Sequence, residues 1–167
     1  MFSRHYEDAA DLKAAPSQVF AFVDDHQRFS SHMNESSWVM GGAKMTTRVD
    51  EGRGQSVGSH IIMSGRIVGL LLELDEVVTV YKPPVEKVWQ TVGRPKLLVI
   101  GQYQMGVRIR PRPDATRLTV FIDYALPDGV VTYWLGRLFG RMYARWCVKQ
   151  MLAGVVGHFA QPDRVAA

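Results

Sequence analysis

Cysteine is scarce in this sequence. Cys147 is the single cysteine among 167 residues, so no disulfide can form within the chain. The first residues, MFSRHYEDAADLKAAP, include acidic side chains and have no apolar core, which is unlike a secretory signal peptide. No apolar run approaches the roughly 18 residues that cross a bilayer. We therefore expect a cytoplasmic protein with no integral membrane segment.

Signatures of metal, phosphate and nucleophile chemistry are also missing. The segment GGAKMTT resembles the Gly-Lys-Thr end of a phosphate-binding loop. It departs from that motif because Met45 follows Lys44 and the upstream glycine is misplaced. No nucleophile elbow or catalytic triad can be recognised. The histidines have no metal-ligand spacing, and they are His5, His26, His32, His60 and His158. We predict no metal and no cofactor.

The charge balance is mildly basic. Lys and Arg number 20 against 16 Asp and Glu, a net charge of +4, which assists encounters with anionic partners without selecting one. Four arginines gather near a predicted turn, and they are Arg108, Arg110, Arg112 and Arg117. No exposed aromatic side chains are expected between them, so they resemble neither a stacking platform nor a groove reader. We predict no nucleic-acid partner.

What is present indicates one globular domain over residues 1–167. Hydrophobic residues make up 47% and charged residues 22%, and no repeat or linker interrupts the chain. Residues 5–14 could form a first strand. Pro16 then begins a helix over residues 16–25, in which Val19 and Phe20 start an apolar stripe. A second short helix over residues 26–33 and a loop to residue 44 follow.

From residue 43 the apolar period changes from helical to two. The expected strands cover residues 43–52, 55–69, 70–81, 85–93, 97–111 and 117–127. A long helix, from about Val130 to Phe159, closes the chain. Consecutive strands joined by short turns pair antiparallel, and the terminal helix is the one predicted element long enough to cover a face. We predict an α+β fold with a curved sheet of six to seven strands around this helix.

Three segments carry a family resemblance. They are AAPSQVFAFVDD, VYKPPVEKVWQTVG and TRLTVFIDYALP. In this order they resemble the START-like helix-grip superfamily, also called SRPBCC, which includes polyketide cyclase/dehydrase and lipid-transport proteins. The resemblance implies that a bent sheet grips the last helix and leaves a cavity between them. Members bind lipids, sterols, polyketides or hormones there, and some are cyclases or dehydratases.

The last helix has two patterns. Cations recur every fourth residue at Arg137, Arg141, Arg145 and Lys149. Large apolar residues lie between and beside them, namely Trp134, Leu135, Leu138, Phe139, Met142, Trp146 and Met151. We expect this apolar face to pack into the sheet and the cations to face solvent. Attachment to an anionic membrane surface and binding of an anionic protein or RNA are the alternatives.

Strand parity and helical spacing predict which side chains line the cavity. Glycine within the strands allows tight bends, and eight methionines supply deformable apolar lining. The alternative is that the same residues complete a packed core. The predicted ligand-binding residues are Phe20, Met63, Val78, Trp89, Tyr103, Met105, Val107, Ile122, Tyr124, Leu138, Met142 and Trp146.

Glu76, Tyr103 and Tyr124 are the candidates for chemistry. Glu76 shares parity with an apolar row, so it must be protonated, paired with arginine, or turned outward. We expect a bulge to turn it outward; if it faces the cavity, it is the best general acid or base. The two tyrosines could orient a ligand through their hydroxyls. Cys147 is interpreted as a small core residue.

These patterns predict that the chain binds a small hydrophobic or amphipathic, lipid- or polyketide-like ligand between sheet and helix. The alternative is a polyketide cyclase or dehydratase acting on a ligand in the same cavity. Catalysis stays open because the resemblance implies that such enzymes need only a shaped cavity and a few polar groups. The sequence predicts no oligomeric state and does not identify the ligand.

Overall fold

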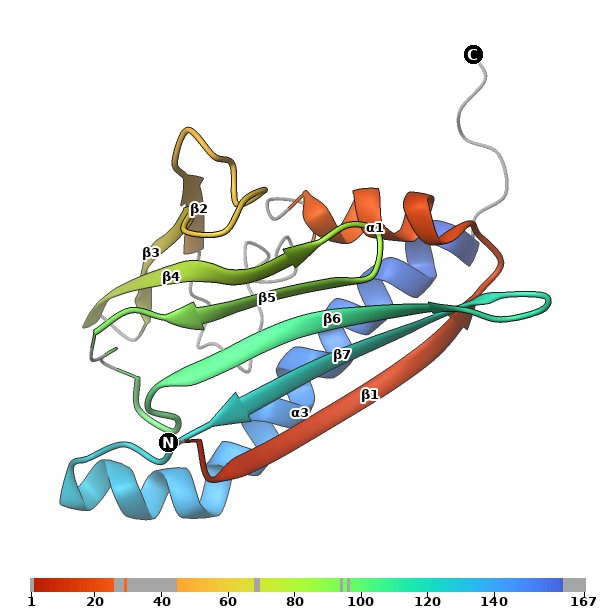
Figure 1. Ribbon diagram of the computed structural model, residues 1–167. Coiled ribbons are helices and arrows are strands. Elements are labelled where there is room, and N and C mark those ends of the chain that lie inside the picture. The colour runs from red at the N-terminus through yellow and green to blue at the C-terminus, as the bar shows by residue number, and fades with distance from the viewer. Residues whose placement is uncertain are drawn as a thin grey trace.

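Seven antiparallel strands form one sheet, and a 31-residue helix crosses its inner face (Figure 1). The computed structural model describes residues 2–25, 29, 45–67, 70–93, 95 and 97–160. The elements are β1 (Arg4–Leu12), α1 (Pro16–Asp24), β2 (Met45–Val49), β3 (His60–Ile67), β4 (Leu70–Lys82), β5 (Glu86–Thr91), β6 (Tyr103–Pro111), β7 (Thr116–Tyr124) and α3 (Val130–Ala160).

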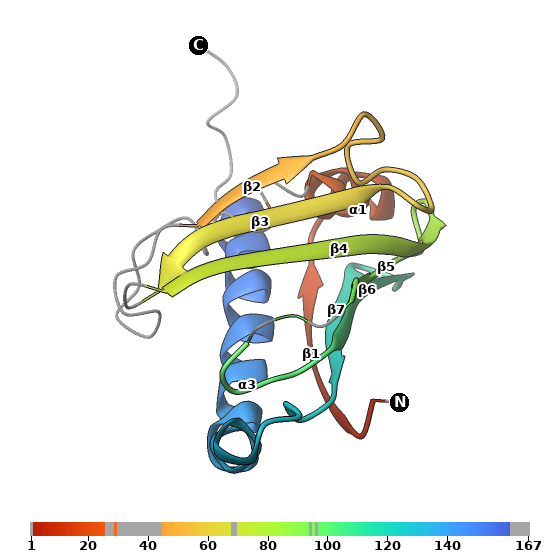
Figure 2. The same ribbon diagram turned by 90° about the vertical axis from the view of Figure 1, so that its left-hand side faces the viewer.

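The strand order is β1-β7-β6-β5-β4-β3-β2. Each strand from β2 to β6 pairs with the next one in the chain, and β1 is the edge strand beside β7. The sheet is strongly bent: β1 and β7 run roughly along α3, whereas β3 and β4 run across it (Figure 2). The predicted α+β helix-grip architecture is therefore confirmed.

Two sequence-based predictions need comment. The predicted second short helix and the loop after it, residues 26–44, lie outside the described residues except for Phe29. The predicted strand 97–111 begins only at Tyr103. Its first part is apolar for another reason, because the backbone of Val99 and the side chain of Ile100 lie against α3.

A buried ion pair ties α1 to the sheet. Nζ of Lys87, a fully buried side chain on β5, lies 2.8 Å from Oδ1 of Asp24 at the end of α1. The hydroxyl of Tyr81 donates a hydrogen bond to the other carboxylate oxygen of Asp24 at 2.9 Å. Burial lowers the pKa of Lys87, and the Asp24 carboxylate opposes this shift by stabilising the ammonium. These contacts of Asp24 with Lys87 and Tyr81, which we call the polar clamp, fix the C-terminal end of α1 to β4 and β5.

The alternation predicted for the two clearest strands is confirmed. On β6, Tyr103 and Met105 are buried on the inner face, as are Val120 and Ile122 on β7. The outer face holds its own small cluster. A Cβ at Gly106 would lie 2.6 Å from the ring of Phe121, so glycine is what lets this ring lie flat on the sheet. The ring is nearly fully buried although its strand position faces outward.

The helix α3 packs through a face other than the predicted one. Leu138 is 69% exposed and Met142 59%, so the prediction that they face the interior is wrong. The buried face consists mainly of small and medium side chains, namely Gly136, Gly140, Ala144, Cys147, Val148, Met151, Leu152 and Val155. The helix approaches so closely that a Cβ at Gly136 would lie 2.7 Å from the carbonyl oxygen of Val99. Large residues cannot occupy that approach.

The cations of α3 are exposed, as predicted, at Arg137, Arg141, Arg145 and Lys149. None of the helices in the described ranges combines the length and the apolar character that a membrane crossing requires.

Candidate functional site

One row of inward-facing residues crosses the sheet from β4 to β7, where β5 and β7 end and β6 begins. Glu76 on β4 is opposite Thr91 on β5, and Tyr103 on β6 is opposite Tyr124 on β7. Thr91 links these two residue pairs, because its hydroxyl oxygen accepts a hydrogen bond from the backbone N–H of Tyr103 at 3.1 Å. Thr91 is short, so the ring of Tyr103 can reach over it toward β4.

The row brings together a carboxyl and a phenol. The hydroxyl of Tyr103 donates a hydrogen bond to Oε1 of Glu76 at 2.5 Å. Trp89 on β5 also hydrogen-bonds the Glu76 side chain. Glu76 is only 1% exposed, so the prediction that it turns outward is wrong. A register shift does occur on β4, but it lies between Val78 and Val80 and leaves Glu76 on the inner face.

Burial dominates the electrostatics of this pair. It raises the pKa of Glu76 from the ordinary 4.5 to about 7, although the hydrogen bonds from Tyr103 and Trp89 oppose the shift. Burial and the neighbouring Glu76 raise the pKa of Tyr103 well above its usual range, so this phenol stays protonated. Near neutral pH Glu76 can therefore hold or release a proton while Tyr103 remains a donor.

The helix supplies two further polar groups. Tyr143 lies one helical turn from Cys147, and the two side chains interact electrostatically with each other and with Glu76. Burial raises the pKa of Cys147 to about 12, which leaves a neutral thiol. The prediction that Cys147 is a core residue is confirmed. Sequence reasoning missed Tyr143; its position between Gly140 and Cys147, on the edge of the small-residue face, was the available signal.

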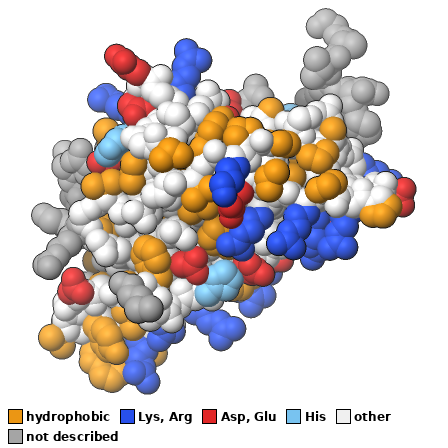
Figure 3. Space-filling view, in the orientation of Figure 1, with side chains coloured by type: hydrophobic (Ala, Val, Ile, Leu, Met, Phe, Trp, Pro, Cys, Tyr) orange, Lys and Arg blue, Asp and Glu red, His pale blue; other side chains and the backbone are white. Residues whose placement is uncertain are grey.

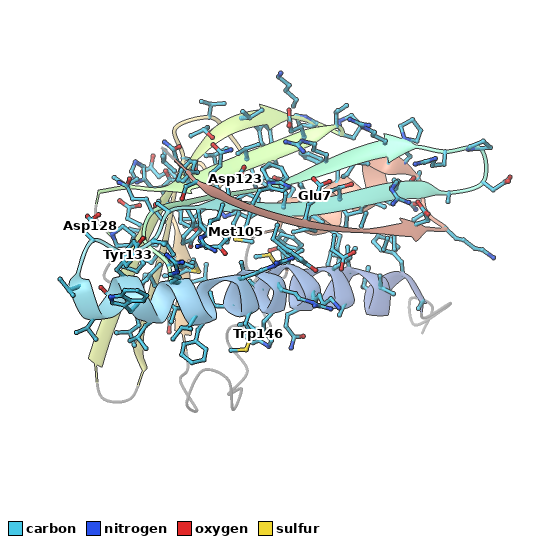
Figure 4. All side chains as sticks on the ribbon, turned by 90° about the horizontal axis from the view of Figure 1, so that it is seen from below. Glu7, Met105, Asp123, Asp128, Tyr133 and Trp146 are labelled. Atoms are coloured by element: carbon cyan, nitrogen blue, oxygen red, sulfur yellow. The ribbon has the colours of Figure 1, made fainter. Side chains whose placement is uncertain are left out.

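Most of the predicted ligand-binding residues lie in the interior. Those buried are Phe20, Met63, Val78, Trp89, Tyr103, Met105, Val107, Ile122 and Tyr124. Met105 lies between the sheet and α3 (Figure 4). Trp146 is partly buried at the margin of the core. Leu138 and Met142 do not belong to this set, because they are exposed. Contact of the buried residues with a ligand stays a prediction.

Glu76 and Tyr103 lie on the inner face of the part of the sheet formed by β4, β5 and β6. The backbone of α3 packs most extensively on β1 and next on β7, which form the other half. Toward β4, β5 and β6, large side chains such as Trp89, Tyr103 and Met105 fill the distance between sheet and helix. A guest molecule that displaced or rearranged these side chains would meet Glu76 and Tyr103 directly.

A separate groove of about 610 Å³ opens on the surface between residues 13–18 and residues 111–116. It lies at the start of α1 and the β6–β7 turn, and none of the predicted ligand-binding residues lines it. Within the described part of the chain, no three His, Cys, Asp or Glu side chains are grouped to hold a metal ion.

Comparison with solved structures supports the fold. The aromatase/cyclase Zhui from Streptomyces sp. R1128 superposes with a TM-score of 0.70 and 16% identity, over 98% of this chain and 96% of that one. Truncated norcoclaurine synthase from Thalictrum flavum superposes with a TM-score of 0.67 and 10% identity, over 96% of this chain and 95% of that one. At these identities the similarity shows the fold alone.

No curated protein sequence matches the chain closely enough to count as a relative. The resemblance to the START-like helix-grip superfamily is nevertheless confirmed by the structures above and by a family model. That model, described as "Polyketide cyclase / dehydrase and lipid transport", matches residues 3–161, and the chain therefore belongs to this family.

Proposed function

We propose that this chain binds a small hydrophobic or amphipathic ligand, lipid- or polyketide-like, in the interior between the sheet and α3. One observation carries the proposal: a hydrogen-bonded carboxyl and phenol, Glu76 and Tyr103, lie in an otherwise apolar core. The apolar body of the ligand would pack on the inner face of β5 and β6. Its polar end would exchange hydrogen bonds with Glu76 and Tyr103.

The free-energy cost of burying Glu76 supports a functional role for this residue. An ionisable side chain in an apolar core destabilises the fold unless it is neutralised or fully hydrogen-bonded. Perturbed ionisable groups of this kind gather at functional sites more than elsewhere. Met63 and Met105 lie in the same core, and their flexible side chains can adapt to a guest of irregular shape.

A second candidate function is catalysis of polyketide cyclisation or dehydration. The raised pKa of Glu76, about 7, favours it, because a group that titrates near neutrality serves as general base and then acid. As base, Glu76 would remove a proton from a carbon between two carbonyls. The resulting enolate carbon would form a bond to another carbonyl carbon farther along the substrate, whose C=O electron pair moves to its oxygen. That oxygen would then take the proton back from Glu76. Tyr103 would donate a hydrogen bond to the developing oxyanion.

Native mass spectrometry of the purified protein tests the binding proposal. We expect a co-purified small molecule that dissociates on mild activation. Met105→Trp should reduce its occupancy at least tenfold while the protein stays folded, because the larger ring takes the place of the guest. Ile109→Met, a volume-conserving change on the same face, is the matched control and should retain the ligand. Undiminished occupancy in Met105→Trp would contradict this location.

Hydrogen–deuterium exchange on an aryl 1,3-diketone separates the two functions. If Glu76 is a general base, wild-type protein accelerates exchange at the central carbon, and Glu76→Gln abolishes the acceleration while binding of the diketone stays within about threefold. Tyr124→Phe, in the same row, tests the second tyrosine in the same way. Equal loss of exchange and binding would exclude catalysis by Glu76 and leave the binding function.

A further inference from the structure

The outward face of α3 carries large apolar side chains that are exposed within the part of the chain that the structure describes. Val131 is 73% exposed, Trp134 57%, Leu138 69% and Met142 59%. These four residues are spaced by three or four positions, so they lie along one side of the helix. We call them the outer stripe. Gly136, Gly140 and the rest of the buried face lie on the other side, against the core. The helix thus has two apolar sides, and the sheet covers only the one with the smaller residues.

A row of cations runs beside the outer stripe. Arg137, Arg141, Arg145 and Lys149 are all exposed, and Val130–Ala160 contains no Asp or Glu. These four positive charges equal the net charge of the whole chain, +4. Within the part of the chain that the structure describes, none of the four forms an ion pair. Their charge is available to a partner.

The outer stripe lies at a projecting part of the molecule. The first turns of α3 extend beyond the edge of the sheet (Figure 1). On the surface, hydrophobic side chains gather at this end with Lys and Arg side chains next to them (Figure 3). The guanidinium of Arg137 lies 5.7 Å from the ring centre of Trp134, so cation and aromatic side chains are directly adjacent. A flat surface could meet both kinds of side chain at once.

We infer that this face of α3 docks on the surface of an anionic lipid bilayer. A helix with Trp and Leu on one side and arginines beside them is suited to the boundary between headgroups and acyl chains. Trp134, Leu138 and Met142 enter that boundary, and Arg137, Arg141 and Arg145 pair with lipid phosphates. A second copy is disfavoured as the occupant, because face-to-face association would bring two rows of four exposed cations together.

This inference does not rest on the proposed ligand. It requires only an exposed apolar stripe, an exposed cation row, and their proximity on one projecting element. The outer stripe and the face of α3 that packs on the core lie on different sides of the helix. Substitutions in the outer stripe therefore do not alter Glu76 or Tyr103.

Vesicle co-sedimentation tests the inference. Wild-type protein should bind vesicles in which about a third of the lipid is phosphatidylglycerol, should ignore pure phosphatidylcholine, and should bind less as salt rises. Neutralising one cation should weaken binding about fivefold, so a triple change of Arg137, Arg141 and Arg145 to Gln should weaken it on the order of 100-fold. Trp134→Ser with Leu138→Ser should weaken it at least tenfold.

Matched controls sit on other surfaces. Arg110→Gln with Arg112→Gln removes exposed cations near the β6–β7 turn, and Val57→Ser with Val85→Ser removes exposed apolar side chains on distant turns. Both pairs should leave vesicle binding unchanged.

Three outcomes would overturn the inference. The first is equal binding to both kinds of vesicle, or none to either. The second is equal loss of binding in the control variants. The third is dimerisation abolished by Trp134→Ser without vesicle binding, which would assign the outer stripe to a second copy.

Discussion

The hydroxyl of Tyr103 reaches across β5 to hydrogen-bond Glu76, with 2.5 Å between the two oxygens. The strands that carry these residues, β6 and β4, are not neighbours. The bond therefore depends on the short side chain of Thr91 between them and on the bend of the sheet. This hydrogen bond fixes Glu76, whose pKa is about 7, in the interior of the protein. The proposed functions depend on that carboxyl group.

Replacing Glu76 by Gln should make the protein more stable at high pH. The folded-state pKa of Glu76, about 7, lies above its ordinary value of 4.5, so the folded state binds its proton more tightly than the unfolded state. Its contribution to stability is complete below pH 4.5 and is lost as pH rises to 7. The variant should exceed wild type by about 3 kcal/mol above pH 7, as measured by urea unfolding.

The same variant should match wild type within about 1 kcal/mol at pH 4, since Gln resembles the protonated acid. Glu7→Gln, at a half-exposed position on the outer face, is the control and should keep the wild-type pH dependence. A Glu76→Gln protein whose stability still falls between pH 4.5 and 7 by the wild-type amount would refute the assignment of that dependence to Glu76.

Replacing Tyr103 by Phe should destabilise the protein more at pH 8 than at pH 4. The phenol lowers the pKa of Glu76, so its removal raises that pKa further. At pH 4 only one hydrogen bond is lost, at a cost of roughly 1 kcal/mol. At pH 8 the carboxylate loses a donor, and the cost grows. Equal destabilisation at the two pH values in chemical unfolding would show that the hydroxyl does not influence the carboxyl.

The buried pair of Lys87 and Asp24 should be strongly coupled. Lys87→Met leaves the Asp24 carboxylate buried without its cation and should cost about 3–5 kcal/mol. Adding Asp24→Leu should recover part of that loss, which a double-mutant cycle measures. The matched control is the exposed pair Arg117–Asp11, at 3.0 Å, where Arg117→Met should cost no more than about 1 kcal/mol. Additive losses at Lys87 and Asp24 would contradict the clamp.

Two glycines of α3 should respond in opposite ways to alanine. A Cβ at Gly140 would lie 2.9 Å from the carbonyl oxygen of Val99, so Gly140→Ala should push the helix from the core and cost about 1–3 kcal/mol. A Cβ at Gly154 meets nothing within 4 Å, so Gly154→Ala should stabilise by roughly 1 kcal/mol through helix propensity. Thermal unfolding of both variants checks this. Stabilisation by Gly140→Ala would contradict the close packing of α3.

The strands could be predicted well where their two faces differ in character. On β6 and β7, apolar inner positions alternate with mostly charged or polar outer ones, and burial follows that alternation except at the outer pair Gly106 and Phe121, which is also buried. Parity alone cannot locate a bulge, and β4 has one. It falls between Val78 and Val80 instead of ahead of Glu76, so the predicted outward turn of Glu76 failed while its role as the candidate acid survived.

The orientation of α3 could not be predicted because the helix is apolar on two sides. Its large residues, such as Trp134 and Leu138, give the stronger hydrophobic pattern, yet they face outward. What decides the contact is distance: Gly136 and Gly140 allow the helix backbone to touch the carbonyl of Val99. Glycine contributes little to a hydrophobic pattern, so its regular spacing was the weaker signal. Tyr143 was missed for the same reason, because it lies at the edge of the small-residue face and not among the large apolar residues.

The most direct test of the binding proposal is methyl NMR of the methionines during titration with two probes, decanoate and 1-naphthol. Met63 and Met105 lie in the core, whereas Met142 is 59% exposed on the outer stripe. We predict that at least one probe shifts the Met63 and Met105 methyl resonances to saturation and leaves Met142 unchanged. Perturbation confined to Met142, or saturable binding that moves neither core methionine, would contradict a guest between the sheet and α3.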